Sequence, residues 1–187
     1  TDELNAAIQA IKDALAALEE GKVTADQPVD KTTLITNPSY DNNNNDGWSG
    51  DKPAFQSWTD AEFYKKKFNT YQKITTAPKG VYALSVQAFY RSGFSDAAYD
   101  NYKNITGYDA KLYAISGTDT LTANVVNPFS EALTEPLEMN ESKVVEGDVT
   151  YYIPNNMETA EAYFNKGLYN NTLFLSTEDG SMTIGMR

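Results

Sequence analysis

The sequence predicts an all-β fold, a sandwich or jelly roll built from short strands. Two observations lead to this class. Apolar and polar residues alternate in several short segments, and turn residues such as Gly, Pro and Asp-Gly separate these segments. Short strands at this density are typical of β-sandwiches and jelly rolls. With 187 residues, the chain is long enough for one domain with a small attachment.

Residues 1–22 are predicted to form a helix that is either a linker or the end of a preceding helical segment. Apolar residues recur at spacings of four and three, so they share one helix face, and alanines fill the positions between them. The stripe favours packing on a neighbouring domain or on the sandwich over a coiled coil, because the heptads are not sustained. Its members are Leu4, Ile8, Ile11, Leu15 and Leu18.

Residues 81–91 give the clearest strand pattern. Even-numbered residues fall on one face of an extended chain and odd-numbered residues on the other, which is the period of a β-strand. Residues 68–76 form the preceding predicted strand. Pro78 and Gly80 supply the dihedral angles of a tight turn between the two segments. The two strands are therefore expected to pair as a hairpin.

Six further segments are predicted strands for the same reasons. Gly117 opens a turn that predicts a second hairpin, and Asp179-Gly180 is the signal of a third near the end of the chain. The segments are residues 32–37, 110–116, 120–126, 149–153, 172–178 and 181–186. The β-sandwich domain is expected to cover residues 30–187. Because the chain stops directly after a strand, we expect this domain to be C-terminally incomplete.

One short helix is expected to interrupt the strands, between residues 149–153 and 172–178. Asn155 can cap its start, Glu158 follows three residues later, and Gly167 suits its end. Its buried face would consist of the apolar residues Met157, Ala160, Tyr163 and Phe164.

Two long irregular segments stand between predicted strands, residues 92–109 and 127–148, and such segments are usually functional or disordered. The first is rich in Tyr and Asn. Sugar rings pack their apolar C–H faces on aromatic rings, while their hydroxyls need polar partners. Most single tyrosines are expected in the core or at its rim, but loops on a rigid scaffold carry binding sites. We predict Tyr99, Tyr102 and Tyr108 as stacking platforms, with Arg91 and Asn101 as hydroxyl partners.

The composition excludes several kinds of chemistry. The chain has no Cys and no His, which removes disulfides, thiolate metal sites, the commonest general base and the usual zinc ligand. The net charge of −11 argues against nucleic acid and anionic membrane surfaces, and suits a neutral or cationic partner. No apolar run approaches the roughly 20 residues that span a bilayer, so no transmembrane segment is predicted.

The run from Asp41 to Gly47 offers Asp and Asn oxygens at alternate positions, as the first half of an EF-hand loop does. An EF-hand is rejected, because the Gly comes one residue late and Lys52 stands where the closing Glu belongs. Two interpretations remain open. The favoured one is a turn in which Asn residues adopt left-handed conformations and bond their own backbone. The other is a structural Ca²⁺ site with Asp41 as a ligand.

An enzyme is not predicted. Without His and Cys, the remaining candidate for catalysis would be a pair of carboxylates, as in glycoside hydrolysis. Candidates such as Glu62, Asp96, Asp100 and Asp109 show no spacing that singles out a pair. A phosphate-binding glycine loop, a nucleophile elbow and a metalloprotease helix are all absent from the sequence. A glycosidase is kept as a third and weak alternative.

Three stretches of this chain resemble known modules. ITNPSYDNNNNDGW is similar to the opening strand of xylan- and glucan-binding sandwich modules. AEFYKKKFNTYQKITTAPKGVYALSVQAFYR and the segment from VTYYIPNN to TIGMR resemble carbohydrate-binding-module-like domains of secreted and cell-surface proteins of gut Bacteroidetes. The resemblance covers about residues 30 to 187. It implies a galactose-binding-like jelly-roll β-sandwich, secretion to the cell surface, and glycan binding beside other modules.

The resemblance carries over to few single residues. Asp41 stands where related modules have an acidic calcium ligand, and the usual partner of that ligand lies on a final strand that this chain does not reach. Gly47-Trp48 matches a motif whose Trp is more often structural, and Arg91 matches the end of the core strand. The predicted function is therefore non-catalytic glycan binding at the bacterial cell surface. The alternative is a structural or protein-interaction module that spaces or docks neighbouring domains within a large surface protein.

Overall fold

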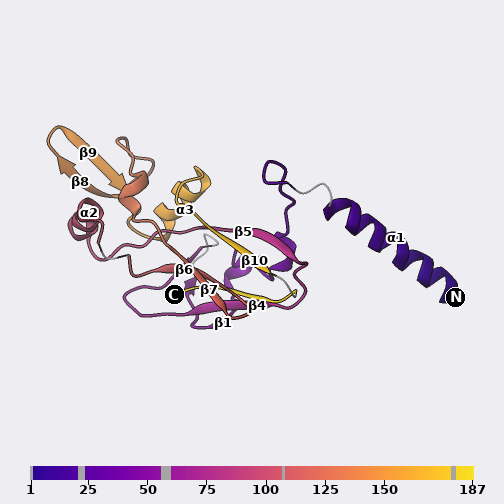
Figure 1. Ribbon diagram of the computed structural model, residues 1–187. Coiled ribbons are helices and arrows are strands. Elements are labelled where there is room, and N and C mark those ends of the chain that lie inside the picture. The colour runs from indigo at the N-terminus through magenta and orange to yellow at the C-terminus, as the bar shows by residue number, and fades with distance from the viewer. Residues whose placement is uncertain (1, 21–23, 56–59, 107, 178–179) are drawn as a thin grey trace. The chain divides into compact units, whose positions relative to one another are not determined.

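The computed structural model describes residues 2–20, 24–55, 60–106, 108–177 and 180–187 (Figure 1). Internal contacts divide the chain into two compact units, residues 1–33 and 34–187, and each is described by itself. The first unit holds helix α1, Asp2–Glu20, which confirms the predicted N-terminal helix. Its apolar side chains are exposed at Leu4, Ile8, Ile11 and Leu15. None of the described helices is long and apolar enough to cross a membrane.

The second unit contains a five-stranded antiparallel sheet in the order β1-β4-β11-β6-β7. Its strands are β1 (Ser49–Gly50), β4 (Thr70–Ile74), β11 (Met182–Met186), β6 (Lys111–Ser116) and β7 (Asp119–Asn124). The predicted hairpin of β6 and β7 is confirmed, with Ser116 opposite Asp119. At the centre of the sheet, Gly185 allows close packing, because a Cβ there would lie 2.5 Å from the Thr70 carbonyl oxygen and 2.8 Å from the Tyr113 ring.

Strands β5 (Gly80–Gln87) and β10 (Asn170–Thr177) form a separate antiparallel pair that packs on this sheet. Burial alternates along both strands, as the period of two predicts. Leu173 and Leu175 of β10 join one hydrophobic core with residues of the larger sheet, including Leu112, Ile184 and Ile74. The fold is thus β-rich and is held by a core between two groups of strands.

Two predicted hairpins are wrong. β4 and β5 follow each other in sequence but belong to different sheets, and the same holds for β10 and β11. In both cases the chain passes from one sheet to the other. The two crossings are joined, because the backbone N–H of Ala77 donates to the carbonyl oxygen of Gly180 at 2.8 Å. Ala77 is buried there and belongs to the core.

Residues 32–37 do not form the predicted strand. The segment begins with the 3₁₀ helix η1 (Thr32–Leu34), followed further on by η2 (Asp41–Asn43). A side chain takes the place of a neighbouring strand, because Gln72 accepts from the Thr36 N–H at 2.7 Å and donates to the Thr36 carbonyl at 2.9 Å. Two short strands, β2 (Ala54–Phe55) and β3 (Ala61–Glu62), pair with each other after β1.

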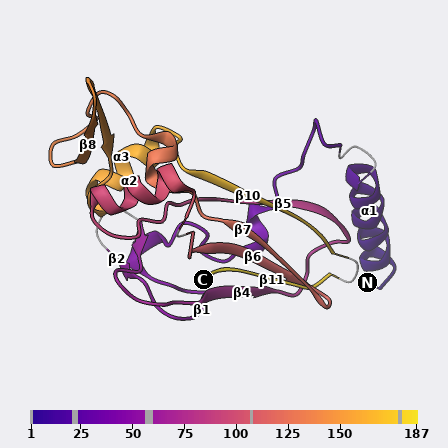
Figure 2. The same ribbon diagram turned by 60° about the vertical axis from the view of Figure 1, so that its left-hand side comes forward.

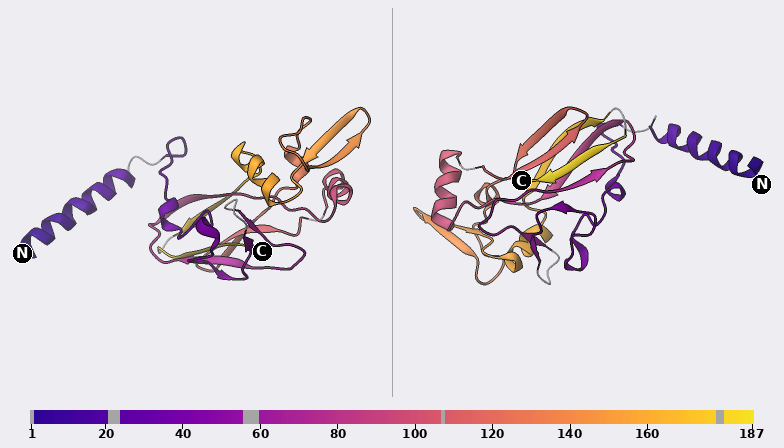
Figure 3. Two further views of the ribbon diagram at one scale, coloured as in Figure 1. Left: turned by 180° about the vertical axis from the view of Figure 1, so that it is seen from behind. Right: turned by 90° about the horizontal axis from the view of Figure 1, so that it is seen from below.

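The segments predicted to be irregular contain regular elements. Residues 92–109 include helix α2 (Ser95–Asn104), and residues 127–148 include the 3₁₀ helix η3 (Pro128–Glu131) and strand β8 (Ser142–Glu146). β8 pairs with β9 (Val149–Ile153), at the same end of the second unit as α2 (Figures 2 and 3). Ala98, Phe129 and Ile153 form a second, smaller core there.

Helix α3, Met157–Asn165, is the predicted inserted helix, but it is not the only one, since α2 is a second. Its cap also differs from the prediction. Asn156, not Asn155, accepts from the Thr159 N–H, and Thr159 bonds back to the Asn156 N–H in a capping box. Met157, Ala160 and Tyr163 are buried as predicted.

Candidate functional site

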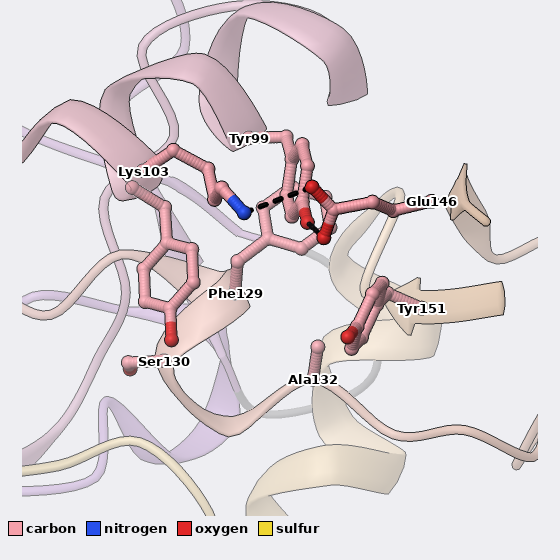
Figure 4. Close-up of a pocket in the computed structure, with 8 residues that line it drawn as sticks. Tyr99, Lys103, Phe129, Ser130, Ala132, Glu146 and Tyr151 are labelled. Carbon is pink, nitrogen blue, oxygen red and sulfur yellow. Dashed lines mark hydrogen bonds and ion pairs between the residues drawn. The ribbon is translucent and has the colours of Figure 1, made fainter. Parts of the chain in front are cut away.

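An aromatic pocket of about 410 Å³ lies between α2, η3 and the β8–β9 hairpin (Figure 4). This volume is within the range of small-ligand sites, roughly 300–1,000 Å³. Four of its lining residues are aromatic and come from three different elements, while the others are small, charged or hydroxyl-bearing. The lining residues are Tyr99, Tyr102, Lys103, Phe129, Ser130, Ala132, Glu146 and Tyr151.

Helix α2 brings three of these residues to the pocket. Tyr99, Tyr102 and Lys103 are three and four positions apart, so they lie on the same helix face. The helix ends at Ile105, which adopts a left-handed conformation with φ 53° and donates its N–H to the last carbonyls of the helix. The sequence thus places both tyrosines on a rigid element instead of a loop.

Tertiary contacts fix α2 in place. Ala98 is fully buried on its inner side against the second core. The buried side chain of Asn127 donates to the Ala98 carbonyl oxygen at 2.9 Å and accepts from the Phe129 N–H at 2.9 Å. A single amide therefore joins α2 to the start of η3, which carries Phe129 and Ser130 into the pocket.

The aromatic rings of the pocket contact one another. Tyr99 packs edge-on against Phe129 with ring centroids 5.0 Å apart, and stacks with Tyr151 at 5.9 Å. Tyr102 lies 6.4 Å from Phe129 and 37 % of it is exposed. Such geometries are the favourable arrangements of aromatic pairs. The rings therefore form one contiguous aromatic wall.

A charged group stands beside this wall. The Glu146 carboxylate accepts from the Tyr99 hydroxyl and forms an ion pair with Lys103 Nζ at 2.8 Å (Figure 4). Lys103 Nζ also lies 5.6 Å from the centre of the Tyr99 ring, at cation–π distance. The bonds from Lys103 and Tyr99 lower the pKa of Glu146, and the same bonds raise the pKa values of Lys103 and Tyr99. Glu146 is therefore ionised at neutral pH.

Of the five predicted ligand residues, Tyr99 and Tyr102 line the pocket, while Arg91, Asn101 and Tyr108 do not. Tyr108 follows α2 and is half-buried. The Asn101 side chain donates to the Ser92 hydroxyl and accepts from the Thr106 hydroxyl. Its backbone carbonyl accepts from the Thr106 N–H just after α2. Arg91 donates to the carbonyl oxygens of Pro154 and Asn155, each at 3.1 Å, and burial lowers its pKa. Its contacts join the chain after β5 to the start of α3.

The Asp41 loop forms a turn with its own hydrogen bonds. The Asn37 side chain accepts from the Asp41 N–H at 2.6 Å and donates to the Asn44 carbonyl at 3.0 Å. Trp48 closes the loop, because its indole N–H donates to the Asn37 carbonyl at 3.0 Å. In the described part of the chain, no three Asp or Glu residues are grouped as a metal site. Calcium at Asp41 stays a prediction.

Sequence reasoning missed five polar or aromatic residues of the pocket, and one of them is Lys103 of α2. Phe129, Ser130 and Glu146 lie in residues 127–148, a segment recognised as long and acidic but not as part of the site. Tyr151 was assigned only to a strand. A usable signal was the period of two in residues 149–153, which places Tyr151 on the same strand face as the apolar Ile153.

Comparisons of this chain with protein-family models, with curated proteins and with solved structures give no match.

Proposed function

We propose that this chain is a non-catalytic glycan-binding module of a secreted or cell-surface bacterial protein. The observation that carries the proposal is the aromatic pocket, in which Tyr99, Tyr102 and Tyr151 lie beside Glu146 and Lys103. Aromatic faces suit the apolar side of a sugar ring, and the charged and hydroxyl groups suit its hydroxyls. The resemblance to carbohydrate-binding modules of Bacteroidetes points to the same function and location.

The proposal includes a jelly-roll β-sandwich. Two features favour it over a simple meander of hairpins. The chain crosses between the two groups of strands at residues 75–79 and again between β10 and β11. Strands distant in sequence, such as β5 and β10, become neighbours as a result. Crossings of this kind are typical of jelly rolls, whereas up-and-down arrangements pair consecutive strands.

In this proposal the predicted ligand residues take different roles. Tyr99 and Tyr102 are stacking platforms, joined by Tyr151. Arg91 supports the site by donating hydrogen bonds to the backbone carbonyls of Pro154 and Asn155. Only the guanidinium N–H groups that these bonds do not use could donate to a sugar hydroxyl. Asn101 stabilises the end of α2. A Ca²⁺ ion at Asp41 would stabilise the fold without touching the sugar.

The test is a glycan-array screen of the purified protein with and without added calcium, followed by titration of the best glycan. Replacing Tyr102 or Tyr151 with Ala is expected to weaken binding about tenfold, since a lost aromatic contact of about 1.4 kcal/mol corresponds to that factor. Phe174→Ala is the matched control, because Phe174 is an aromatic residue of β10 that is 69 % exposed and does not line the pocket. Its binding should equal that of the wild type.

Two results would contradict glycan binding at this pocket. One is a blank array with protein that circular dichroism shows to be folded. The other is an equal loss of affinity for Phe174→Ala and Tyr102→Ala, which would indicate a non-specific aromatic effect. Release of reducing sugar from a bound glycan would instead support the glycosidase alternative.

A structural or protein-interaction module is the second candidate. It is favoured by one observation, the exposed apolar stripe of α1, in which Leu4 is 59 % and Ile11 61 % exposed. Contiguous exposed apolar surface commonly marks an interaction site. A module of this type would space or dock domains in a large surface protein, and a blank glycan array would favour it.

A further inference from the structure

The Glu146 carboxylate is the starting point for the choice of ligand. It comes from the end of β8 and faces α2, where the Tyr99 hydroxyl donates to one of its oxygens and Lys103 Nζ bonds the other at 2.8 Å. Side-chain exposure is 51 % for Lys103 and 47 % for Glu146. The ion pair is thus half open to solvent and borders the pocket.

The pocket already accommodates an ammonium group. Lys103 Nζ is held between a carboxylate and the face of the Tyr99 ring, 5.6 Å from the ring centre. A carboxylate combined with aromatic faces is the environment that recognises ammonium ligands, because the negative faces of the rings attract a cation. Tyr151 stacks with Tyr99 at a ring-centroid distance of 5.9 Å and widens this aromatic surface.

We propose that the pocket selects glycans that carry positively charged amino groups, and that the sugar ammonium replaces Lys103 on Glu146. This inference rests on the proposed glycan-binding function and names its ligand class. Lys103 acts as an internal substitute for the ligand: it keeps Glu146 paired while the pocket is empty and turns to solvent when the sugar binds.

Three physical arguments favour an aminated sugar over a neutral or acidic one. Exposed ion pairs are weak, so Lys103 can leave Glu146 at small cost, and the exchange of one ammonium for another keeps the carboxylate neutralised. An anionic sugar would face the Glu146 carboxylate, which acts as a repulsive element. The net charge of −11 attracts cationic chains over a longer range.

The test compares two oligosaccharides of equal length by titration calorimetry: a tetramer of glucosamine and a tetramer of N-acetylglucosamine. The measurements are made at about pH 5.5, more than two units below the pKa of an ordinary α-amino group, so that the sugar amines carry charge. The glucosamine tetramer is expected to bind at least about tenfold more tightly. Raising the salt concentration from about 0.01 M to about 0.1 M, which shortens the screening length from about 30 Å to about 10 Å, should weaken it.

Two variants make the test specific to the carboxylate. Glu146→Gln keeps an acceptor for Tyr99 but removes the charge, so the preference for the glucosamine tetramer should disappear. Lys103→Met keeps a long side chain and removes the competitor, so affinity for the glucosamine tetramer should rise about threefold or more. Thermal melting of both variants checks that the fold is unchanged, and the two variants must act in opposite directions.

The outcomes separate the two proposals. Equal binding of both tetramers, weakened by Tyr102→Ala, would overturn the selection of amines while glycan binding at the pocket stands. A preference for the glucosamine tetramer that survives Glu146→Gln would also overturn it, because attraction by the overall negative charge would then suffice. Failure of both tetramers and of every glycan on the array would overturn both proposals together.

Discussion

The carboxyl group of Asp60 is partly buried, and burial disfavours its ionised form. Its Oδ1 is buried and has no hydrogen-bond partner among the described residues. Burial raises the pKa of Asp60 to about 6, and the negative charges of Glu161 and Glu62 add to the effect. The ionised form is therefore disfavoured in the folded protein.

This pKa predicts how stability depends on pH. Because the folded pKa is higher than the unfolded one of about 3.9, the stabilising contribution of protonated Asp60 is complete below about pH 4 and is lost as the pH rises through about 6. Asp60→Asn is neutral at every pH, so we expect it to melt at a higher temperature than the wild type at about pH 8 and at the same temperature near pH 4.

The measurement is thermal unfolding of both proteins across this pH range. Asp148→Asn is the control, since Asp148 is an exposed acid in the turn between β8 and β9. It removes the same charge at an exposed position, so it should raise the melting temperature at about pH 8 by less than Asp60→Asn does. A melting difference for Asp60→Asn that stays constant with pH would show that the carboxyl does not titrate as expected.

At the candidate site, sequence could predict residue types better than partners. Tyr99 and Tyr102 stood out because they are aromatic residues in a stretch between strands. Glu146 lies more than 40 positions further along the chain, and its bond to Lys103 depends on how β8 packs against α2. Arg91 was a reasonable hydroxyl partner by type, yet folding directs it to two backbone carbonyls. Long-range packing decides these cases, and no local pattern encodes it.

Among the helices, α3 shows how a cap determines where a helix begins. The Asn156 side chain accepts from the Thr159 N–H at 2.9 Å, and the Thr159 hydroxyl accepts from the Asn156 N–H at 3.1 Å. Two N–H groups that would lack partners in the first turn are satisfied in this way. The polar residue one position earlier, Asn155, instead bonds the Ser142 hydroxyl and links α3 to β8.

Asn156→Ala is expected to destabilise the protein by about 1 kcal/mol, the usual cost of losing an N-cap side chain. For a chain of this size, that change lowers the melting temperature by about 2–4 °C. Asn165→Ala, at the exposed end of the same helix, should change stability by less than about 0.5 kcal/mol. Urea unfolding of the three proteins checks this, and an equal loss in both variants would contradict the assignment of the cap.

Turn signals located the bends of this chain but not the pairing of the strands around them. The β6–β7 hairpin was predictable, because only two residues separate the paired Ser116 and Asp119. Residues 75–79 form a longer connection, which can lead either to a neighbouring strand or across the core. Burial of Ala77 at the crossing favours the second path. Helix α2 was missed because Asn, Asp and Tyr are poor helix formers, and packing of Ala98 compensates for them.

At the scale of the whole chain, both hydrophobic cores lie within residues 34–187. Leu34 and Ile35 pack against the core of the main sheet as partly buried residues. The first residues that contact this core therefore lie directly after the boundary between the two units. We expect residues 34–187 to fold without residues 1–33 and to melt within about 2 °C of the complete chain, which corresponds to less than about 1 kcal/mol. Differential scanning calorimetry of both proteins checks this; a clearly lower melting temperature would show that residues 1–33 stabilise the second unit.

The position of β11 has a consequence for how the protein folds. β11 lies between β4 and β6, and Ile184 stands opposite Gln72 on one side and Ala114 on the other. During synthesis, β4 and β6 leave the ribosome long before β11. The strand that lies between them in the folded sheet is therefore missing at first. Contacts so distant in sequence slow folding, and open strand edges invite wrong pairing meanwhile. The nascent chain therefore depends on protection of these edges until β11 arrives.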